Sequence, residues 1–217
     1  GVIVASATWP PSFARAFHEA GVPVVQACGH HSSKPGVHVV GIDNIEAGRI
    51  AAHELIRRGY DSVGLLGGPR NATSSQDRQT GFLSELQKHP TIRVTSCFAA
   101  DYSFGAGRAE MTQLLKAGPA QAYFCGDDVL SIGALSAITD AGLRVPQDIG
   151  LIGLNDMEMA GWQNINLTTI HQPIRKIITA AVDLVEAMLD DPDGVPEARL
   201  FACSVIERGT LPPVGGR

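Results

Sequence analysis

The sequence predicts an α/β fold built from parallel β-sheets that helices cover on both faces. Short apolar runs alternate with longer amphipathic stretches along almost all of the 217 residues. A β-strand and an α-helix differ in the period of their apolar residues, so this alternation predicts strand–helix–strand units. Strands joined through helices run parallel, and parallel sheets are covered on both faces.

The segment of residues 120–173 carries the most information about the fold. An apolar run in it ends in the pair Asp127-Asp128, and the next apolar run ends in Asn155-Asp156. A helix-like stretch joins the two runs, which predicts one βαβ unit. Both polar pairs then lie at the carboxyl ends of parallel strands, where open α/β sheets bind their ligands.

The remaining elements follow the same alternation. Apolar runs predict strands at residues 2–5, 22–26, 38–42, 62–66, 94–98, 121–125 and 149–154. Helical patterns fill residues 44–59, 73–89 and 104–118, with Gly59, Pro90 and Gly118 at their ends. A long amphipathic helix is predicted over residues 174–189, and two short apolar segments surround Cys203.

Composition excludes several classes of protein. The 17 basic residues are scattered among 22 acidic ones, so no electrostatic footprint for DNA is visible in this chain. No apolar run approaches the roughly 18 residues of a membrane span, and no signal peptide is recognisable. The four cysteines form no CxxC pair and are predicted to be buried free thiols in a reducing compartment. We therefore expect a cytoplasmic protein without membrane contact.

Five segments, in order, resemble the effector-binding core of the LacI/GalR family of transcriptional regulators. They are GIDNIEAGRIAAHELIRRGYDSVGLLGG (residues 41–68), RQTGF (78–82), DDVLSIGAL continued by GLRVPQDIGLIGLND (127–156), LTTIHQP (167–173) and ERGT (207–210). Each segment alone is weak evidence. Five at the family's spacing identify the chain as a member, and the resemblance covers residues 1–212.

The resemblance implies a periplasmic-binding-protein-like fold of two doubly wound parallel-sheet subdomains, with an effector between them. It assigns residues 1–41 and 173–196 to the first subdomain, residues 42–172 and 197–212 to the second, and residues 213–217 to a tail. The family's first subdomain begins two βα units earlier, after a helix-turn-helix headpiece. We therefore expect the first subdomain to be incomplete and the DNA-binding headpiece to be absent from this chain.

Two residues that follow successive strands are predicted to bind the effector, Arg78 from the first turns of a helix and Tyr102 from a loop. Arg78 opens the RQTGF motif, and a guanidinium can donate two parallel hydrogen bonds to a carboxylate or to vicinal hydroxyls. A surface ion pair is the alternative role for Arg78. Tyr102 matches the family's aromatic position, where a ring stacks on the effector and keeps a hydroxyl for hydrogen bonding. Packing of a half-buried loop tyrosine is its alternative.

The two polar pairs are each divided into one binding and one structural residue. By resemblance Asp127 and Asn155 face the effector, while Asp128 caps the following helix and Asp156 supports the structure. The family places Asn at the position of Asp127 and Asp at the position of Asn155. In this chain the acid and the amide have therefore exchanged places. Ser74 and Ser75, upstream of Arg78, are further hydroxyl candidates, although serines also suit a helix N-terminus without binding anything.

Other chemistries are weakly represented. Adjacent carboxylates at a strand end point in different directions, so Asp127 and Asp128 do not predict a catalytic pair. His30-His31 lies in a polar loop without other metal ligands, and no nucleotide-binding or nucleophile motif occurs. No cofactor, metal or catalytic residue is expected. Trp162 and Ile132 match the family's dimer contact, although core positions suit them equally, and we expect a homodimer.

We therefore expect the ligand-sensing domain of a transcriptional regulator. Its partners would be a small polar effector, namely a sugar, sugar acid or nucleobase, and operator DNA through the headpiece only. Two other functions stay open. A solute-binding protein of a transport system shares the fold but needs an export signal, and an enzyme on a doubly wound sheet needs a catalytic motif.

Overall fold

The computed structural model describes residues 1–5, 16–17, 19–28, 35–192 and 194–215. The chain divides into two compact units, which are described separately. Unit 1 comprises Gly1–Asn44, Ala72–Ser74 and Pro173–Cys203, and unit 2 comprises Ile45–Asn71, Ser75–Gln172 and Ser204–Arg217.

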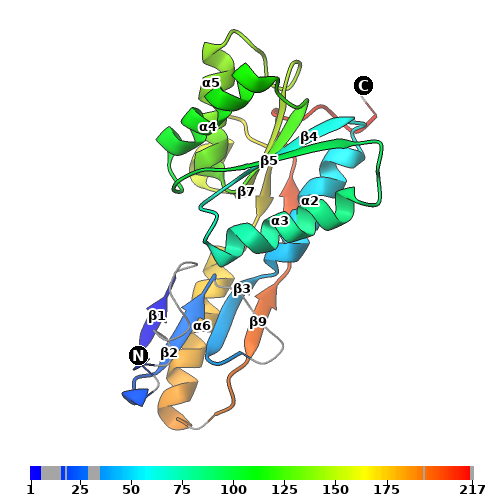
Figure 1. The fold of residues 1–217 in the computed structure, drawn as a ribbon. Coiled ribbons are helices and arrows are strands. Elements are labelled where there is room, and N and C mark those ends of the chain that lie inside the picture. The colour runs from blue at the N-terminus through cyan, green and yellow to red at the C-terminus, as the bar shows by residue number, and fades with distance from the viewer. Residues whose placement is uncertain (6–15, 18, 29–34, 193, 216–217) are drawn as a thin grey trace. The chain divides into compact units, whose positions relative to one another are not determined.

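The described residues of unit 1 form a four-stranded sheet and one long helix. The strand order is β1-β2-β3-β9, and every described pair is parallel. The strands are β1 (Val2–Val4), β2 (Val24–Ala27), β3 (His38–Ile42) and β9 (Ala198–Phe201). Helix α6 (Ile174–Asp190) packs against these strands through Ile177, Ala180, Ala181 and Leu184, which recur at helical spacing (Figure 1).

Unit 2 is built on a six-stranded sheet with the order β10-β8-β7-β6-β4-β5. Its strands are β4 (Ser62–Gly67), β5 (Arg93–Phe98), β6 (Ala122–Cys125), β7 (Gly150–Asn155), β8 (Thr169–His171) and β10 (Ser204–Ile206). Neighbouring strands are parallel except for the antiparallel pair of β8 and β10. The carboxyl ends of β4 to β8 therefore lie along one edge.

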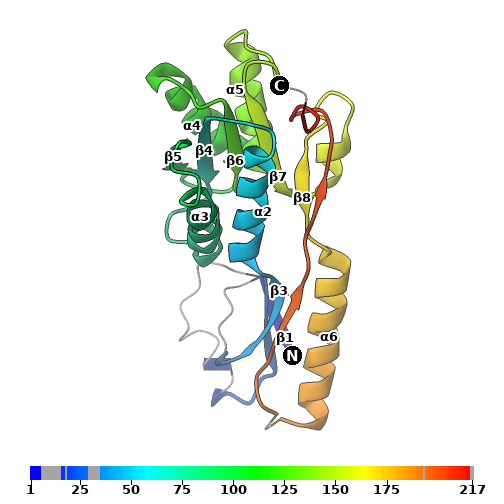
Figure 2. The ribbon, with the colours of Figure 1, turned by 90° about the vertical axis from the view of Figure 1, so that its right-hand side faces the viewer.

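Helices cover both faces of the unit 2 sheet. They are α2 (Asn44–Ile56), α3 (Thr73–Leu86), α4 (Phe104–Ala117) and α5 (Asp128–Asp140), with a short 3₁₀ helix, η1 (Glu158–Gly161). The chain moves outward from β4 to β5 and then back to β6 and β7. Right-handed crossovers therefore put α3 on one face and α4 and α5 on the other, as Figures 1 and 2 show.

On each face the backbones of the two helices approach closely, with a glycine from each helix at the crossing. A Cβ on Gly81 of α3 would lie closer than 3.0 Å to the carbonyl oxygen of Ile45 in α2. A Cβ on Gly133 of α5 would also lie closer than 3.0 Å to the carbonyl oxygen of Phe104 in α4. Side chains larger than hydrogen are excluded at both crossings, so the helix pairs pack as closely as backbones allow.

The α/β prediction with parallel sheets is confirmed, and two expectations need correction. Residues 197–212 were assigned to the second subdomain, but β9 pairs with β3 and lies in unit 1, so the chain leaves that unit after Cys203. The three-residue strand β8 was not predicted because Thr168 and Thr169, although fully buried, do not read as an apolar run.

The cysteine prediction is only partly correct. None of the four cysteines is disulfide-bonded, but only Cys125 is buried, while Cys28, Cys97 and Cys203 are intermediate in exposure.

Candidate functional site

The candidate site lies at the carboxyl edge of the unit 2 sheet. Arg78 lies in α3, the helix that follows β4, and Asn155 is the last residue of β7. Tyr102 and Asp127 lie in the loops that follow β5 and β6. Because these strands are parallel neighbours, their carboxyl ends share one edge, and the four predicted residues come from four adjacent or near-adjacent connections.

Arg78 and Asp127 are joined through the loop that follows β6. The Arg78 Nη1 atom donates a hydrogen bond to the carbonyl oxygen of Gly126, at 2.6 Å. The adjacent Asp127 is 8% exposed, and its burial raises the pKa of the carboxyl group. The backbone amide of Leu130 and the positive charge of Arg78 oppose that rise. The structure thus brings a guanidinium and a carboxylate, both predicted to bind the effector, into electrostatic contact.

Tyr102 lies over the loop that follows β4. A Cβ on Gly68 would lie closer than 3.0 Å to its ring, so glycine leaves the space that the ring occupies. The Tyr102 hydroxyl is 2.8 Å from the Ser75 hydroxyl. Ser75, rather than Ser74, is thus the serine that the structure places beside Tyr102. Both serines are buried, and consecutive residues of α3 point about 100° apart.

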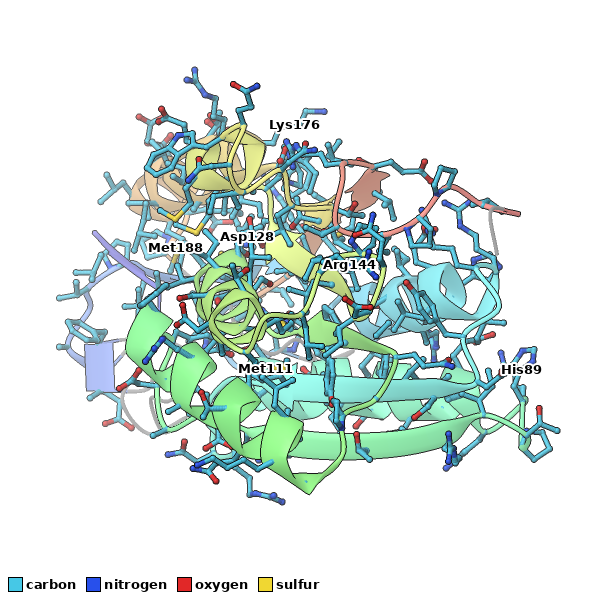
Figure 3. All side chains as sticks on the ribbon, turned by 90° about the horizontal axis from the view of Figure 1, so that it is seen from above. His89, Met111, Asp128, Arg144, Lys176 and Met188 are labelled. Carbon is cyan, nitrogen blue, oxygen red and sulfur yellow. The ribbon has the colours of Figure 1, made fainter. Side chains whose placement is uncertain are left out.

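The helix-capping role predicted for Asp128 is wrong, because Asp127 caps α5. The Asp127 Oδ1 atom accepts a hydrogen bond from the Leu130 amide at 2.8 Å. Asp128 is fully buried and accepts from the Thr169 hydroxyl at 2.6 Å and from the Met157 amide at 2.7 Å. Burial raises the pKa of Asp128 to about 6, although both hydrogen bonds favour the charged form. Figure 3 labels Asp128 at the start of α5.

Asn155 and Asp156 end β7 in a left-handed turn. Their φ angles are 119° and 57°, a region that residues with a Cβ rarely adopt. The Asn155 Oδ1 atom accepts a hydrogen bond from Gln172 Nε2 at 2.7 Å. Asp156 forms an ion pair with Arg208 at 2.7 Å and a contact with His171 at 3.0 Å. The structural role predicted for Asp156 is therefore confirmed.

Gln172 was not singled out from the sequence as a site residue. It is 7% exposed and belongs to the LTTIHQP segment, whose resemblance to the family was the available signal. Only the parallel pairing of Asn155 in β7 with His171 in β8 places Gln172 beside Asn155. Sequence spacing alone contains no information about that register.

Two other sequence predictions concern the surface and the metal sites. Trp162 is 53% exposed, which makes a core role for this side chain wrong, and Ile132 is half-buried. His30 and His31 lie outside the described residues. Among the described residues, no group of His, Cys, Asp and Glu side chains is arranged to hold a metal ion. None of the described helices has both the length and the apolar character needed to cross a membrane.

Comparison with known proteins gives one family match and close relatives. The profile of the periplasmic binding protein-like domain matches residues 52–211. The HTH-type transcriptional repressor PurR of Klebsiella pneumoniae is 35% identical over 147 residues, which are 66% of this chain and 43% of that protein. The chain thus spans less than half the length of this curated relative.

Solved structures of LacI-type regulators share the fold. A LacI transcriptional regulator from a Rhodococcus species superposes with a TM-score of 0.88 at 25% identity, covering 98% of this chain and 78% of that one. The lac repressor dimer bound to operator and the anti-inducer ONPF gives a TM-score of 0.83 at 26% identity, covering 97% and 73%. These relatives are transcription regulators, so the comparisons do not favour the alternative function as a solute-binding protein of a transport system.

Proposed function

Because the chain belongs to the periplasmic binding protein-like family, as a LacI/GalR-type effector-binding domain, we propose that it senses a sugar or a sugar acid. Binding would occur at the carboxyl edge of the unit 2 sheet and control operator binding by a helix-turn-helix headpiece. The observation that carries the proposal is the gathering of four polar side chains at one edge of the sheet, at or after the ends of β4, β5, β6 and β7. They are Arg78, Tyr102, Asp127 and Asn155.

The chemistry of this edge suits a ligand with several hydroxyl groups. Arg78 donates hydrogen bonds, the Asp127 carboxylate accepts them, and the Tyr102 ring offers a flat face to a pyranose or furanose. An ionised carboxylate has about four acceptor positions, so capping α5 leaves Asp127 able to accept from a ligand hydroxyl. The charges of Arg78 and Asp127 offset each other, which favours a neutral sugar slightly over a sugar acid, with a nucleobase as the third class.

A thermal-shift screen with neutral sugars, sugar acids and nucleobases tests the proposal. A ligand at 100 times its dissociation constant should stabilise the native state by about 2.7 kcal/mol. Arg78→Ala should abolish the shift, and it should lower the melting temperature of the free protein only modestly, through the lost hydrogen bond to the Gly126 carbonyl. The matched control is Arg144→Ala, which removes an exposed arginine whose partner is Asp148. Binding retained in Arg78→Ala, or lost in Arg144→Ala, would contradict the assignment.

We propose further that the regulator acts as a homodimer in the cytoplasm and has no catalytic activity. The exposed Trp162 ring and the half-buried Ile132 would form part of the dimer contact. Trp162→Ala should lower the dimer fraction in sedimentation equilibrium. Phe104→Ala, which removes a 45% exposed aromatic side chain from α4, should leave that fraction unchanged. Equal effects of both variants would exclude a specific contact at Trp162.

The proposed route to DNA is through the headpiece alone. The 217-residue chain has a net charge of −5 and no cluster of basic residues in its sequence. It should therefore give no sequence-specific, salt-sensitive gel shift with operator DNA. A shift of that kind by this chain would place DNA-binding residues within it and contradict the proposal.

A further inference from the structure

The turn that carries Asn155 is unfavourable in itself. Two consecutive residues with side chains, Asn155 and Asp156, have φ angles of 119° and 57°. Backbone of this kind persists only where the surrounding structure holds it, and it is concentrated at ligand sites and switches. Identifying what holds this turn therefore identifies what directs the Asn155 amide.

One of the groups that hold the turn is the buried carboxylate of Asp128. It reaches from the start of α5 to the residue after the turn, where Oδ2 accepts from the Met157 amide at 2.7 Å. Its other oxygen, Oδ1, accepts from the Thr169 hydroxyl of β8 at 2.6 Å. Asp128 is 0% exposed, so its carboxylate is shielded from water and depends on these two donors.

Strand β7 leaves space for the Asp128 carboxylate, because it has a glycine at position 153. A Cβ on Gly153 of β7 would lie closer than 3.0 Å to both Asp128 Oδ1 and the Ser131 hydroxyl oxygen. A side chain at position 153 would thus occupy the place of the carboxylate. The far side of the turn is held separately, because Asp156 accepts from Arg208 Nη2 at 2.7 Å.

We propose that Asp128 is a positioning residue that fixes the left-handed turn Asn155–Asp156 and thereby directs the Asn155 amide toward the effector. The part concerning the effector rests on the proposed function of Asn155. Asp128 acts through two hydrogen bonds of fixed geometry, to the Met157 amide after the turn and to Thr169 on the neighbouring strand. It touches no ligand itself.

The burial of the Asp128 carboxylate also supports a positioning role. The pKa of Asp128 is raised to about 6, first by desolvation and then by the negative charges of Asp127 and Asp156. Asp127 shares the helix N-terminus with it, while Asp156 is paired with Arg208 and His171, and the buried thiol of Cys125 also lies within electrostatic reach. An ionised side chain is thus kept at an unfavourable place, where it accepts two hydrogen bonds.

The test is an NMR measurement of amide exchange on the 217-residue chain without any ligand. In Asp128→Ala the Met157 amide should exchange about tenfold faster, the equivalent of one lost hydrogen bond, and the Asn155 side-chain amide resonances should shift. In Asp128→Asn the Met157 exchange rate and the Asn155 resonances should remain near their wild-type values. The amide oxygen of the new side chain accepts from Met157, and its nitrogen donates to the Thr169 hydroxyl.

The matched control is Asp148→Ala. Asp148 also accepts from a backbone amide and from a side chain, both of Arg144, but on the surface. This variant should leave Met157 and Asn155 unchanged. Unchanged Met157 exchange in Asp128→Ala would overturn the proposal. So would an equal rise in exchange across the whole of unit 2, or a failure of Asn to restore the wild-type values.

A second measurement covers the case in which Asp128→Ala does not fold. In the wild-type chain the Asp128 carboxyl carbon and the Met157 amide nitrogen should titrate with one common midpoint. A Met157 shift that does not follow Asp128 would overturn the proposal. Neither experiment contains an effector, so their failure would leave the effector role of Arg78 intact, and failure of the ligand screen would leave this positioning role intact.

Discussion

Two neighbouring strand ends of unit 2 begin with the same kind of polar pair and use it differently. At the end of β6 the chain passes directly into α5, and Asp127 needs only to accept from the Leu130 amide to start the helix. At the end of β7 the chain makes a left-handed turn instead, and Asn155 and Asp156 are held by Gln172, Arg208 and His171.

The difference shows that the end of β6 is stabilised by residues close in sequence, whereas the end of β7 is stabilised by residues from other segments, including the end of β6. A helix start is satisfied locally, by one side chain and the amides of the next turn. The turn after β7 needs partners from three other segments, one of which is Asp128 at the first strand end. Changes at the β7 end should therefore affect both ends, while changes at the Asp127 cap should remain local.

The largest effect is expected where the two ends meet. In Gly153→Val, a branched side chain would displace the Asp128 carboxylate and leave the Met157 amide and the Thr169 hydroxyl without their acceptor. Overpacking together with lost buried hydrogen bonds should cost about 4 kcal/mol in the free energy of unfolding by urea. Gly105→Ala is the control, because a Cβ there meets nothing within 4 Å and should slightly stabilise α4.

The next largest effect is on the pH dependence of stability. The folded-state pKa of Asp128 is raised to about 6, so at pH 5 the folded state holds a proton that the unfolded state has released. The stabilisation from this proton is complete below the unfolded pKa of about 4 and is lost as the pH rises through 6. Asn does not titrate, so the Asp128→Asn variant lacks this loss. Between pH 4 and pH 7 its free energy of unfolding should therefore rise relative to that of the wild type, by on the order of 2–3 kcal/mol.

Urea denaturation of both proteins across this pH range measures that difference. Subtracting one curve from the other removes the contributions of carboxylates such as Asp148 and Glu207, whose pKa values are lowered by arginine partners. A difference that does not vary with pH would show that Asp128 does not titrate in this range.

A smaller effect is expected at the self-supporting strand end. Asp127→Ala removes the N-cap of α5 and should cost about 1 kcal/mol of unfolding free energy, while Asp127→Ser should recover most of it. The amide exchange of Met157 should not change in either variant. If removing the Asp127 cap also released Met157, the two strand ends would be one cooperative element.

The smallest effect is expected on the far side of the turn. His171 is 42% exposed on its side chain, and its contact with Asp156 is one of two that this carboxylate makes. His171→Ala should change the free energy of unfolding by only a few tenths of a kcal/mol. A loss above about 1 kcal/mol in urea denaturation would mean that His171 holds the turn as firmly as Arg208 does.

The larger part of the fold could be predicted because burial gives parallel strands a continuous apolar sequence. Residues 122–125 and 151–154 are completely buried, and both were expected as strands. Strand β8 was not, since Thr168 and Thr169 are buried through their hydrogen bonds. The position of β9 depends on its pairing with β3, which lies about 160 residues away and leaves no local signal.

The site could be predicted less completely. The role of each of its residues changes if a helix start or a strand pairing shifts by one residue. Asp127 and Asp128 are adjacent, and only the actual start of α5 decides which one caps the helix and which one turns inward. The same holds for Ser74 and Ser75, of which the helix turns one toward Tyr102. The partnership of Asn155 with Gln172 depends on the register of two parallel strands.

The two glycine crossings, Gly81 against Ile45 and Gly133 against Phe104, also limit which mutations the domain can accept. A backbone-to-backbone crossing leaves no space between the two helices for a side chain. New specificities on this scaffold should therefore accumulate in the strand-end loops, where residues can be exchanged without disturbing the framework. For an engineer, those loops are the place to introduce variation, and the glycines of both crossings should be held constant.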